Sequence, residues 1–407
     1  MKENFGEMSE KGILKLESLD VKGREIFGLE PKMEKFSRLE IDKDVEIVEK
    51  NNKIISNIDL NEAFIFVDPR NGTESHLVQA PHWRSISQDV KASLNTKSGT
   101  EYYYEANTKG AGYLKPTLKG GHSLDEYLEW KRVDELEYKG AYGLVDKHSN
   151  EFIFNDGGNI ISKTNWFADI GFRSELFYAV GDLKNIYYCG QLVPVEKLIE
   201  QNIIPKDFIP EIGIRLIKIN ARIAEVKDSD EERAKELFEQ AFDVFNKETK
   251  DKKLQYPEIK IGDLKSEKLY FQVFFERMGR NMAIFQNIGH TGWSLHSANI
   301  TLAAEIVDTG SYDSWKADID DPDVVKKYSG VRRGVLKDMR DVSYGLRSLI
   351  EAGEEVGMKT PKKDFLVDKF LESFASAVNR EAVEKEDANI NEITTAFSKI
   401  VRAVIVE

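Results

Sequence analysis

The sequence of 407 residues predicts a mixed α+β protein with a strand-rich N-terminal half and a mainly helical C-terminal half. Up to about residue 219, short apolar runs end in turn-forming residues or alternate with polar ones, which is typical of strands. From residue 230 onward, apolar residues recur every three or four positions over long segments, which predicts helices. At roughly 100–200 residues per domain, the length predicts two or three compact units.

Individual elements follow from these two patterns. Strands are expected at Ala63–Asp68, Tyr102–Ala106 and Ile212–Ile219, with two short strands, or a strand and a connector, in Ile186–Val195. Helices are expected at Ser123–Glu137, Trp166–Val180, Asp230–Thr249, Leu269–Ile288, Val331–Ala352 and Val367–Asn379. The predicted division is an N-terminal extension over 1–60, a strand-rich part over 61–196 with an insert at about 115–160, and a helical part over 197–407. A hinge is expected around Leu192–Pro205.

The charge balance points away from nucleic acid as a partner. Lys and Arg number 58 against 71 Asp and Glu, which gives a net charge of −13, whereas general nucleic-acid binding needs a basic surface. No stretch approaches 18 consecutive apolar residues, so neither a membrane helix nor a membrane partner is expected. The charged start MKENFGEMSEKG lacks the apolar core of a secretory signal, and we expect a cytoplasmic protein.

Two oxygen-bearing side chains flank one apolar run in the C-terminal half. Asn299 precedes Ile300–Val307 (ITLAAEIV), and Asp308 follows it and begins an Asp-Thr-Gly triplet. A hairpin over this run would bring the Asn299 carbonyl and the Asp308 carboxylate together. Mg²⁺ prefers few protein oxygens plus substrate oxygens, so the pair predicts a site for Mg²⁺ and nucleotide phosphates. The alternative is that both residues only form the turns that close the hairpin.

The same segment resembles the catalytic segment of protein-kinase-like folds. Leu295–Ile300 (LHSANI) is similar to the corresponding stretch of small-molecule kinases, where the Asn and a later Asp hold metal. In that register, Ser294 stands where a kinase has its catalytic Asp, so the carboxylate base is missing. His296 is expected to order the loop, and it is the alternative proton acceptor.

Three further segments resemble the selenoprotein O family, whose members have a pseudokinase-like fold and transfer AMP. They are Thr108–Gly112 (TKGAG), Phe172–Phe177 (FRSELF) and Arg215–Arg222 (RLIKINAR), in the same order as in the family. The resemblance covers roughly residues 102–312, about half of the chain. It implies an α+β, two-lobed protein-kinase-like fold, with 61–196 as the strand-rich N-lobe and 197–407 as the helical C-lobe.

The resemblance implies a role for each matching residue of the N-terminal half. Lys109 would be a strand lysine that contacts nucleotide phosphates, within a segment that includes Gly110 and Gly112. Glu175 would be its ion-pair partner on the following helix. On the residues alone, Lys109 and Glu175 could instead form a solvated surface pair.

Further roles are implied for residues toward the C-terminus. Arg215 and Arg222 would contact the phosphates of ATP bound in a flipped orientation, so that AMP is transferred, while Asn299 and Asp308 would bind Mg²⁺ or Mn²⁺. The catalytic set implied by the resemblance is Lys109, Glu175 and Asp308. Alternatively, the two arginines could be an exposed strand residue and a helix-start residue that serve the acidic helix near 228–239.

The chain departs from the family at several positions. Ala298 replaces an Asp proposed as the base, and Asp156–Asn159 lacks the family's Arg. The single cysteine, Cys189, excludes an internal disulfide and lies far from the family's C-terminal redox residue. The leading hypothesis is transfer of AMP from Mg²⁺–ATP to a hydroxyl of a protein substrate or of the chain itself. The alternatives are a kinase with a replaced base and an inactive nucleotide-binding pseudokinase.

Overall fold

The computed structural model describes residues 35–67, 73–74, 78–82, 85–111, 145–147, 159–188, 191–201, 204, 206–288, 290–291, 295–309, 313–314, 333–378 and 390–406. The expectations for Gly112, Ser294, Cys189 and the helix over 123–137 concern residues outside these ranges. The described residues form two compact units. The first takes residues from Met1–Asn95, Tyr102–Ile153 and Leu176–Asn220, and the second from Thr96–Glu101, Phe154–Glu175 and Ala221–Glu407.

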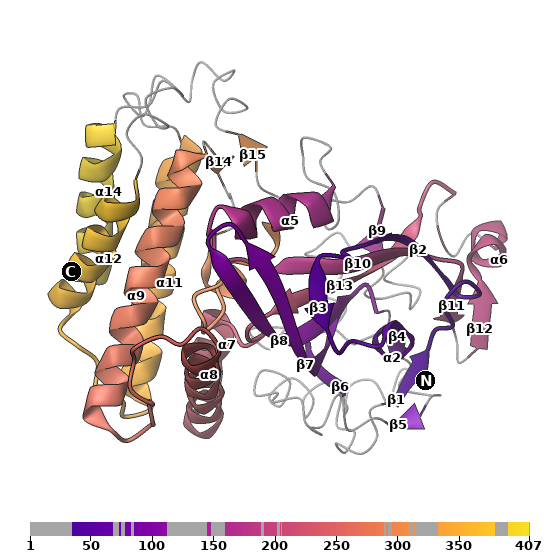
Figure 1. The fold of residues 1–407 in the computed structure, drawn as a ribbon, viewed down its shortest axis with the longest axis horizontal. Helices are drawn as coiled ribbons and strands as arrows, with labels where there is room; N and C mark the ends of the chain where they lie inside the picture. Colours follow the sequence, from indigo (N-terminus) through magenta and orange to yellow (C-terminus); the bar gives the residue numbers. More distant parts are fainter. Residues whose placement is uncertain are drawn as a thin grey trace, which may run out of the picture. The chain divides into compact units, whose positions relative to one another are not determined.

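The first unit is built on one large sheet (Figure 1). Its strands run in the order β2, β10, β13, β8, β7, β3, with β6 beside β7 and β9 beside β13. The pairs of β10 with β2 and β13, and of β13 with β8, are antiparallel. The bounds are β2 Val45–Lys50, β3 Ile54–Ser56, β6 Val78–His82, β7 Ser85–Thr96, β8 Gly99–Lys109, β9 Val145–Asp146, β10 Leu176–Leu183 and β13 Pro210–Ile217.

Smaller elements complete the first unit. A three-stranded sheet has the order β4, β1, β5, and β11 pairs with β12 as a hairpin. The bounds are β1 Lys35–Arg38, α2 Leu60–Ala63, β4 Ile65–Val67, β5 Thr73–Glu74, β11 Asn185–Tyr188, β12 Gln191–Pro194 and α6 Val195–Glu200. The strands expected near 63–68, 102–106, 186–195 and 212–219 are thereby confirmed.

Strand β13 is buried along its whole length, including its polar residues. Arg215 is 2% exposed, and its Nε donates a hydrogen bond to Asn107 Oδ1 of β8 at 2.8 Å. The next lysine, Lys218, donates to the Tyr102 carbonyl at 2.7 Å and lies over the Tyr103 ring. The alternation that predicts this strand therefore places polar side chains in a hydrogen-bonded interior rather than in water. This burial rules out Arg215 as an exposed strand residue.

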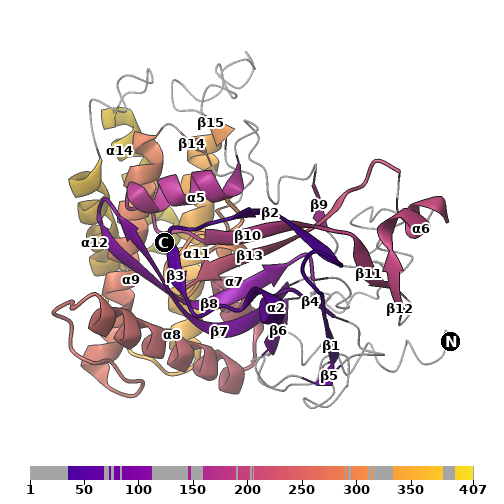
Figure 2. The same cartoon turned by 45° about the vertical axis from the view of Figure 1, so that its right-hand side comes forward.

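The second unit is mainly helical, so the chain is a mixture of α and β structure as the sequence predicts. In two views, α9, α12 and α14 lie side by side (Figures 1 and 2), and α11 packs against α14. The bounds are α5 Ile160–Asp169, α7 Ile223–Asp228, α8 Glu231–Asp251, α9 Leu264–Asn287, β14 His290–Thr291, the 3-10 turn η3 Ser297–Asn299, β15 Asp313–Ser314, α11 Arg333–Glu355, α12 Lys363–Ala377 and α14 Ile390–Ile405. The four long helices expected after residue 230 are confirmed at α8, α9, α11 and α12. Among the described helices, none combines the length and the apolar character of a membrane span.

The helix expected over Trp166–Val180 is wrong, because α5 ends at Asp169 and β10 begins at Leu176. Gly171 adopts φ +79°, a conformation that favours glycine, and its N–H bonds to the Ala168 carbonyl. The next N–H, of Phe172, bonds to the Phe167 carbonyl. These two bonds form a Schellman motif, which closes the helix before the apolar spacing ends.

A close approach of two helix backbones sets the packing of α9 on α12. A Cβ added at Gly279 of α9 would collide with the backbone carbonyl oxygen of Phe370 on α12. We therefore expect Gly279→Ala to lower the free energy of unfolding by about 1–3 kcal/mol, since the helices must separate to admit a methyl group. Urea denaturation measures this change in the free energy of unfolding. Lys265→Ala, on the exposed side of α9, is the control, and an unchanged midpoint for Gly279→Ala would contradict the packing.

Candidate functional site

The run between Asn299 and Asp308 folds back on itself within the second unit. Ile300 and Ile306 form an antiparallel bridge, and the Val307 N–H donates to the Asn299 carbonyl at 3.0 Å. The turn between them is closed by a bond from the Thr301 N–H to the Glu305 carbonyl at 2.9 Å. The expected hairpin is thus a tight, buried turn that brings Asn299 and Asp308 together; we name residues 299–308 the site turn.

A third side chain, Arg222, meets this pair. Its Nη1 donates to the Ala298 carbonyl at 2.5 Å and to Asn299 Oδ1 at 3.3 Å, and it lies 3.5 Å from Asp308 Oδ2. The Arg222 side chain is 7% exposed, so it does not serve as a surface residue. Asp308, by contrast, keeps 31% of its side chain exposed. The turn therefore presents one solvent-accessible carboxylate beside a buried guanidinium.

Asp308 has a left-handed backbone that its neighbours hold in place. Its φ is +58°, which costs free energy for any residue with a Cβ. On one side, Val307 is bonded to Asn299. On the other, the N–H and Oγ1 of Thr309 both donate to Glu175 Oε1, at 2.7 and 2.9 Å. Strain of this kind persists where the surroundings fix it and is common at functional sites.

The position of Glu175 corrects one expectation. This residue lies in an extended connector just before β10, not on a helix, because α5 has already ended. Its side chain is buried and binds Thr309, next to Asp308. Lys109, at the end of β8, is also buried, which rules out a solvated surface pair. Because Lys109 and Glu175 belong to different units, their ion pair stays a prediction.

Backbone contacts hold Arg222 directly beside the site turn. Arg222 forms an antiparallel β-bridge with Thr301. The flanking residues add two backbone hydrogen bonds, from the Ile223 N–H to the Ile300 carbonyl and from the Leu302 N–H to the Ala221 carbonyl. The Arg222 N–H donates to Glu225 Oε2 at 3.0 Å, which caps the start of α7. The backbone position from which the Arg222 side chain extends is therefore fixed.

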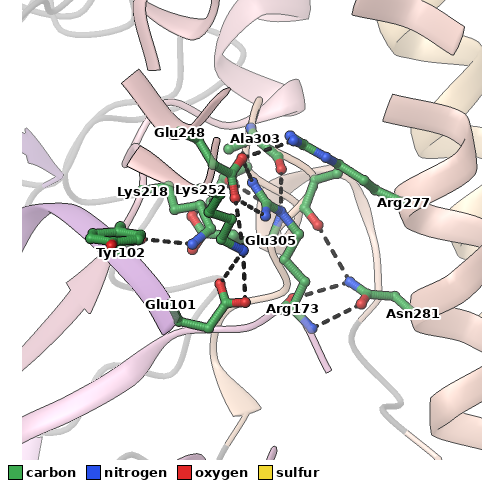
Figure 3. Close-up of polar contacts among 12 residues, drawn as sticks. Glu101, Tyr102, Arg173, Lys218, Glu248, Lys252, Arg277, Asn281, Ala303 and Glu305 are labelled. Carbon is green, nitrogen blue, oxygen red and sulfur yellow. Dashed lines mark hydrogen bonds and ion pairs between the residues drawn. The ribbon is translucent and has the colours of Figure 1, made fainter. Parts of the chain in front are cut away.

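Two buried side chains and one partly buried arginine bind three consecutive carbonyls at the tip of the site turn. Tyr270 Oη donates to Leu302 at 2.7 Å, Arg173 Nε to Ala303 at 2.7 Å, and Asn281 Nδ2 to Ala304 at 3.3 Å. Figure 3 shows Arg173 and Asn281 converging on this tip. Burial raises the pKa of the Tyr270 phenol above its usual value, so this hydroxyl remains a donor. The tip is therefore held by side chains from α9 and from the connector after α5.

A buried carboxylate, Glu248 of α8, binds the cations behind the tip (Figure 3). Arg173 donates to it with two nitrogens, at 2.6 and 2.8 Å, and Arg277 Nη2 lies 2.8 Å from Oε2. Lys252 lies 3.3 Å from Oε1 and also bonds to Glu101. Burial acts to lower the pKa of Arg173, but the charge and hydrogen bonds of Glu248, together with the charges of Glu305 and Glu101, raise that pKa above its usual value. Burial, and then the charge of Arg173, lower the pKa of Arg277.

The remaining predicted site residues are placed as follows. Gly110 directly follows β8, and Arg215 binds Asn107, two residues before Lys109 on that strand. Ala298 contributes its carbonyl to Arg222. Partial burial lowers the pKa of His296, with Asp341 acting in the opposite direction. Across the part of the chain that the structure describes, no group of three or more His, Cys, Asp or Glu side chains is placed to hold a metal ion.

Four residues that support the site turn have no such role in the predictions from sequence: Tyr270, Asn281, Thr309 and Glu248. One signal was available for Glu248, which continues the apolar stripe of Leu237, Ala241 and Val244 at helical spacing. A carboxylate on an apolar stripe predicts a buried charge with a cationic partner. Nothing in the spacing identifies the partner.

Comparisons with known proteins add little to this geometry. A scan against models of protein families finds no match, and a search of curated proteins finds none either. Among solved structures, the chain is similar to the kinase domain of a Toxoplasma gondii specific rhoptry antigen, with 7% sequence identity and a TM-score of 0.27. The match covers 79% of this chain and 84% of that one. A TM-score this low carries no argument about fold or function.

Proposed function

We propose that the chain binds a Mg²⁺–nucleotide at the site turn and transfers AMP from ATP to a hydroxyl of a protein. The observation that supports this proposal is that Arg222 Nη1 lies 3.3 Å from Asn299 Oδ1 and 3.5 Å from Asp308 Oδ2. An amide and a carboxylate oxygen are hard ligands that fit Mg²⁺, and a guanidinium fits phosphate oxygens. The fold we propose for this function is the two-lobed, protein-kinase-like one.

The residues around the turn favour adenylyl transfer over ordinary phosphoryl transfer. A kinase needs a carboxylate near the metal-binding Asn, but Ala298 occupies the preceding position and Ser294 the place of the catalytic Asp. Transfer of AMP with loss of pyrophosphate relies on positioning and on cations that stabilise charge at phosphorus. Arg222, beside the site turn, is the cation proposed for this role.

The test uses the purified full chain with Mg²⁺ and ATP labelled at either the α- or the γ-phosphate. We expect α-label on protein and release of labelled pyrophosphate from γ-labelled ATP. Transfer of γ-label would overturn adenylyl transfer in favour of a kinase, in which neutral His296 is the candidate base.

A thermal-unfolding measurement with Mg²⁺ and a non-hydrolysable ATP analogue separates binding from chemistry. Ligand at a hundred times its Kd stabilises the native state by about 2.7 kcal/mol. Stabilisation without transfer of either label would indicate an inactive nucleotide-binding protein. If the ligand does not stabilise the protein and no label is transferred, the proposed nucleotide site is wrong.

A further inference from the structure

We propose that Arg222 occupies the cation position of the site turn when nucleotide is absent, so that a divalent metal binds there only together with phosphate. This inference rests on the proposed function and adds to it a coupling between metal and nucleotide. Its consequence is that the free metal ion alone binds weakly, while the metal–nucleotide complex binds well.

Arg222 lies where a metal ion between Asn299 and Asp308 would bind. One nitrogen, Arg222 Nη1, contacts Asn299 Oδ1 at 3.3 Å and approaches Asp308 Oδ2 at 3.5 Å. A Mg²⁺ ion between the same two oxygens would lie about 2.0–2.1 Å from each. The guanidinium nitrogen and the metal would therefore compete for the same space between these two residues.

A metal ion without phosphate would meet a like charge at the site turn. Asp308 is the carboxylate of this set, and it already faces the positive charge of Arg222. A divalent ion beside a guanidinium that is 7% exposed would bring like charges together where water screens them poorly. Phosphate oxygens remove this conflict, because they bind the metal and also accept two hydrogen bonds from a guanidinium.

The backbone around the site turn is held by hydrogen bonds, whereas the Arg222 side chain can rotate. Asn299 is held by its backbone bonds to His296 and Val307, and Asp308 is flanked by two bonded neighbours. The backbone of Arg222 is fixed by Ile300 and Glu225. The rotatable side chain of Arg222 is thus the element that can exchange Asn299 and Asp308 for phosphate. Its bond to the Ala298 carbonyl would then also break.

The test measures binding of Mn²⁺ alone to the full chain by electron paramagnetic resonance of the free ion, and binding of Mn²⁺–ADP by equilibrium dialysis of labelled ADP. We expect Arg222→Gln to bind Mn²⁺ alone at least about tenfold more tightly than the unaltered protein. In the presence of ADP, the same variant is expected to bind the Mn²⁺–nucleotide at least about tenfold more weakly. Lys227→Gln, an exposed position on α7 that loses the same charge, is the control and should change neither affinity.

Opposite signs for the two ligands distinguish this exchange from damage to the fold, which would weaken both. Weaker Mn²⁺ binding by Arg222→Gln without nucleotide would overturn the inference, as would Mn²⁺ binding to the unaltered protein that ADP does not improve. Failure of the proposed function has a different signature. In that case Mn²⁺ and ADP still bind together and Arg222→Gln still shifts the two affinities in opposite directions, but no α-label of ATP is transferred to protein.

Discussion

Replacing Glu248 with glutamine is expected to lower the free energy of unfolding by about 3–5 kcal/mol. The substitution keeps the size of the side chain but removes the negative charge that Arg173, Arg277 and Lys252 share. Both arginines remain positive and mostly shielded from water, with 12% and 18% of their side chains exposed, and the pKa of Arg277 is already lowered by burial and by Arg173. An uncompensated buried charge is among the most costly defects that a fold can carry.

Urea unfolding of the two proteins measures this loss. Glu239→Gln is the matched control, because it removes the same charge from an exposed position of the same helix, α8. We expect the control to stay within about 0.5 kcal/mol of the unaltered protein. Equal losses for the two variants would mean that the carboxylate of Glu248 does not carry the network.

Replacing Asp308 with asparagine is expected to weaken Mg²⁺-dependent nucleotide binding at least about tenfold, or about 1.4 kcal/mol. Asparagine has nearly the same shape and tolerates positive φ, so the strained backbone at +58° should persist. The variant loses the negative charge that attracts the metal and that also faces Arg222, while Arg222 keeps its hydrogen bonds to the Ala298 carbonyl and to Asn299. The free energy of unfolding should therefore also fall, and ligand affinity is compared well below the unfolding transition of the variant.

Titration with a fluorescent ATP analogue, with and without EDTA, checks the Asp308→Asn prediction. Asp243→Asn, at an exposed position of α8, is the control for the loss of one negative charge. If Asp308→Asn binds the analogue as tightly as the control does, Asp308 is only a turn residue, and the alternative drawn from the sequence is correct.

The sequence predicts the long, regular elements, and it fails where a short turn or a tertiary contact decides the structure. The helices after residue 230 are recovered because their apolar stripes extend over many turns. The spacing from Trp166 to Val180 predicts a helix, yet one glycine, Gly171, ends α5 and the apolar residues continue as a strand. Apolar spacing alone does not distinguish a buried strand from a buried helix segment.

The candidate site can likewise be predicted only in part from the sequence. The sequence predicts that Asn299 and Asp308 lie close together, because they stand at the two ends of one short apolar run. The convergence of Arg222 on them depends on the bridge from Arg222 to Thr301, 79 residues later in the chain. Likewise, the pairing of Thr309 with Glu175 joins residues 134 apart, and no local pattern encodes it.

The second unit is assembled from three separated stretches of the chain, and this has a consequence for how it is made. A fragment that starts at Ala221 would contain the site turn but lack Arg173 and Glu175, which bind the Ala303 carbonyl and Thr309. During synthesis, these two residues leave the ribosome well before their partners and must wait for more than a hundred further residues. Closing such long loops slows folding, so we expect the unit to form only after most of the chain has been synthesised.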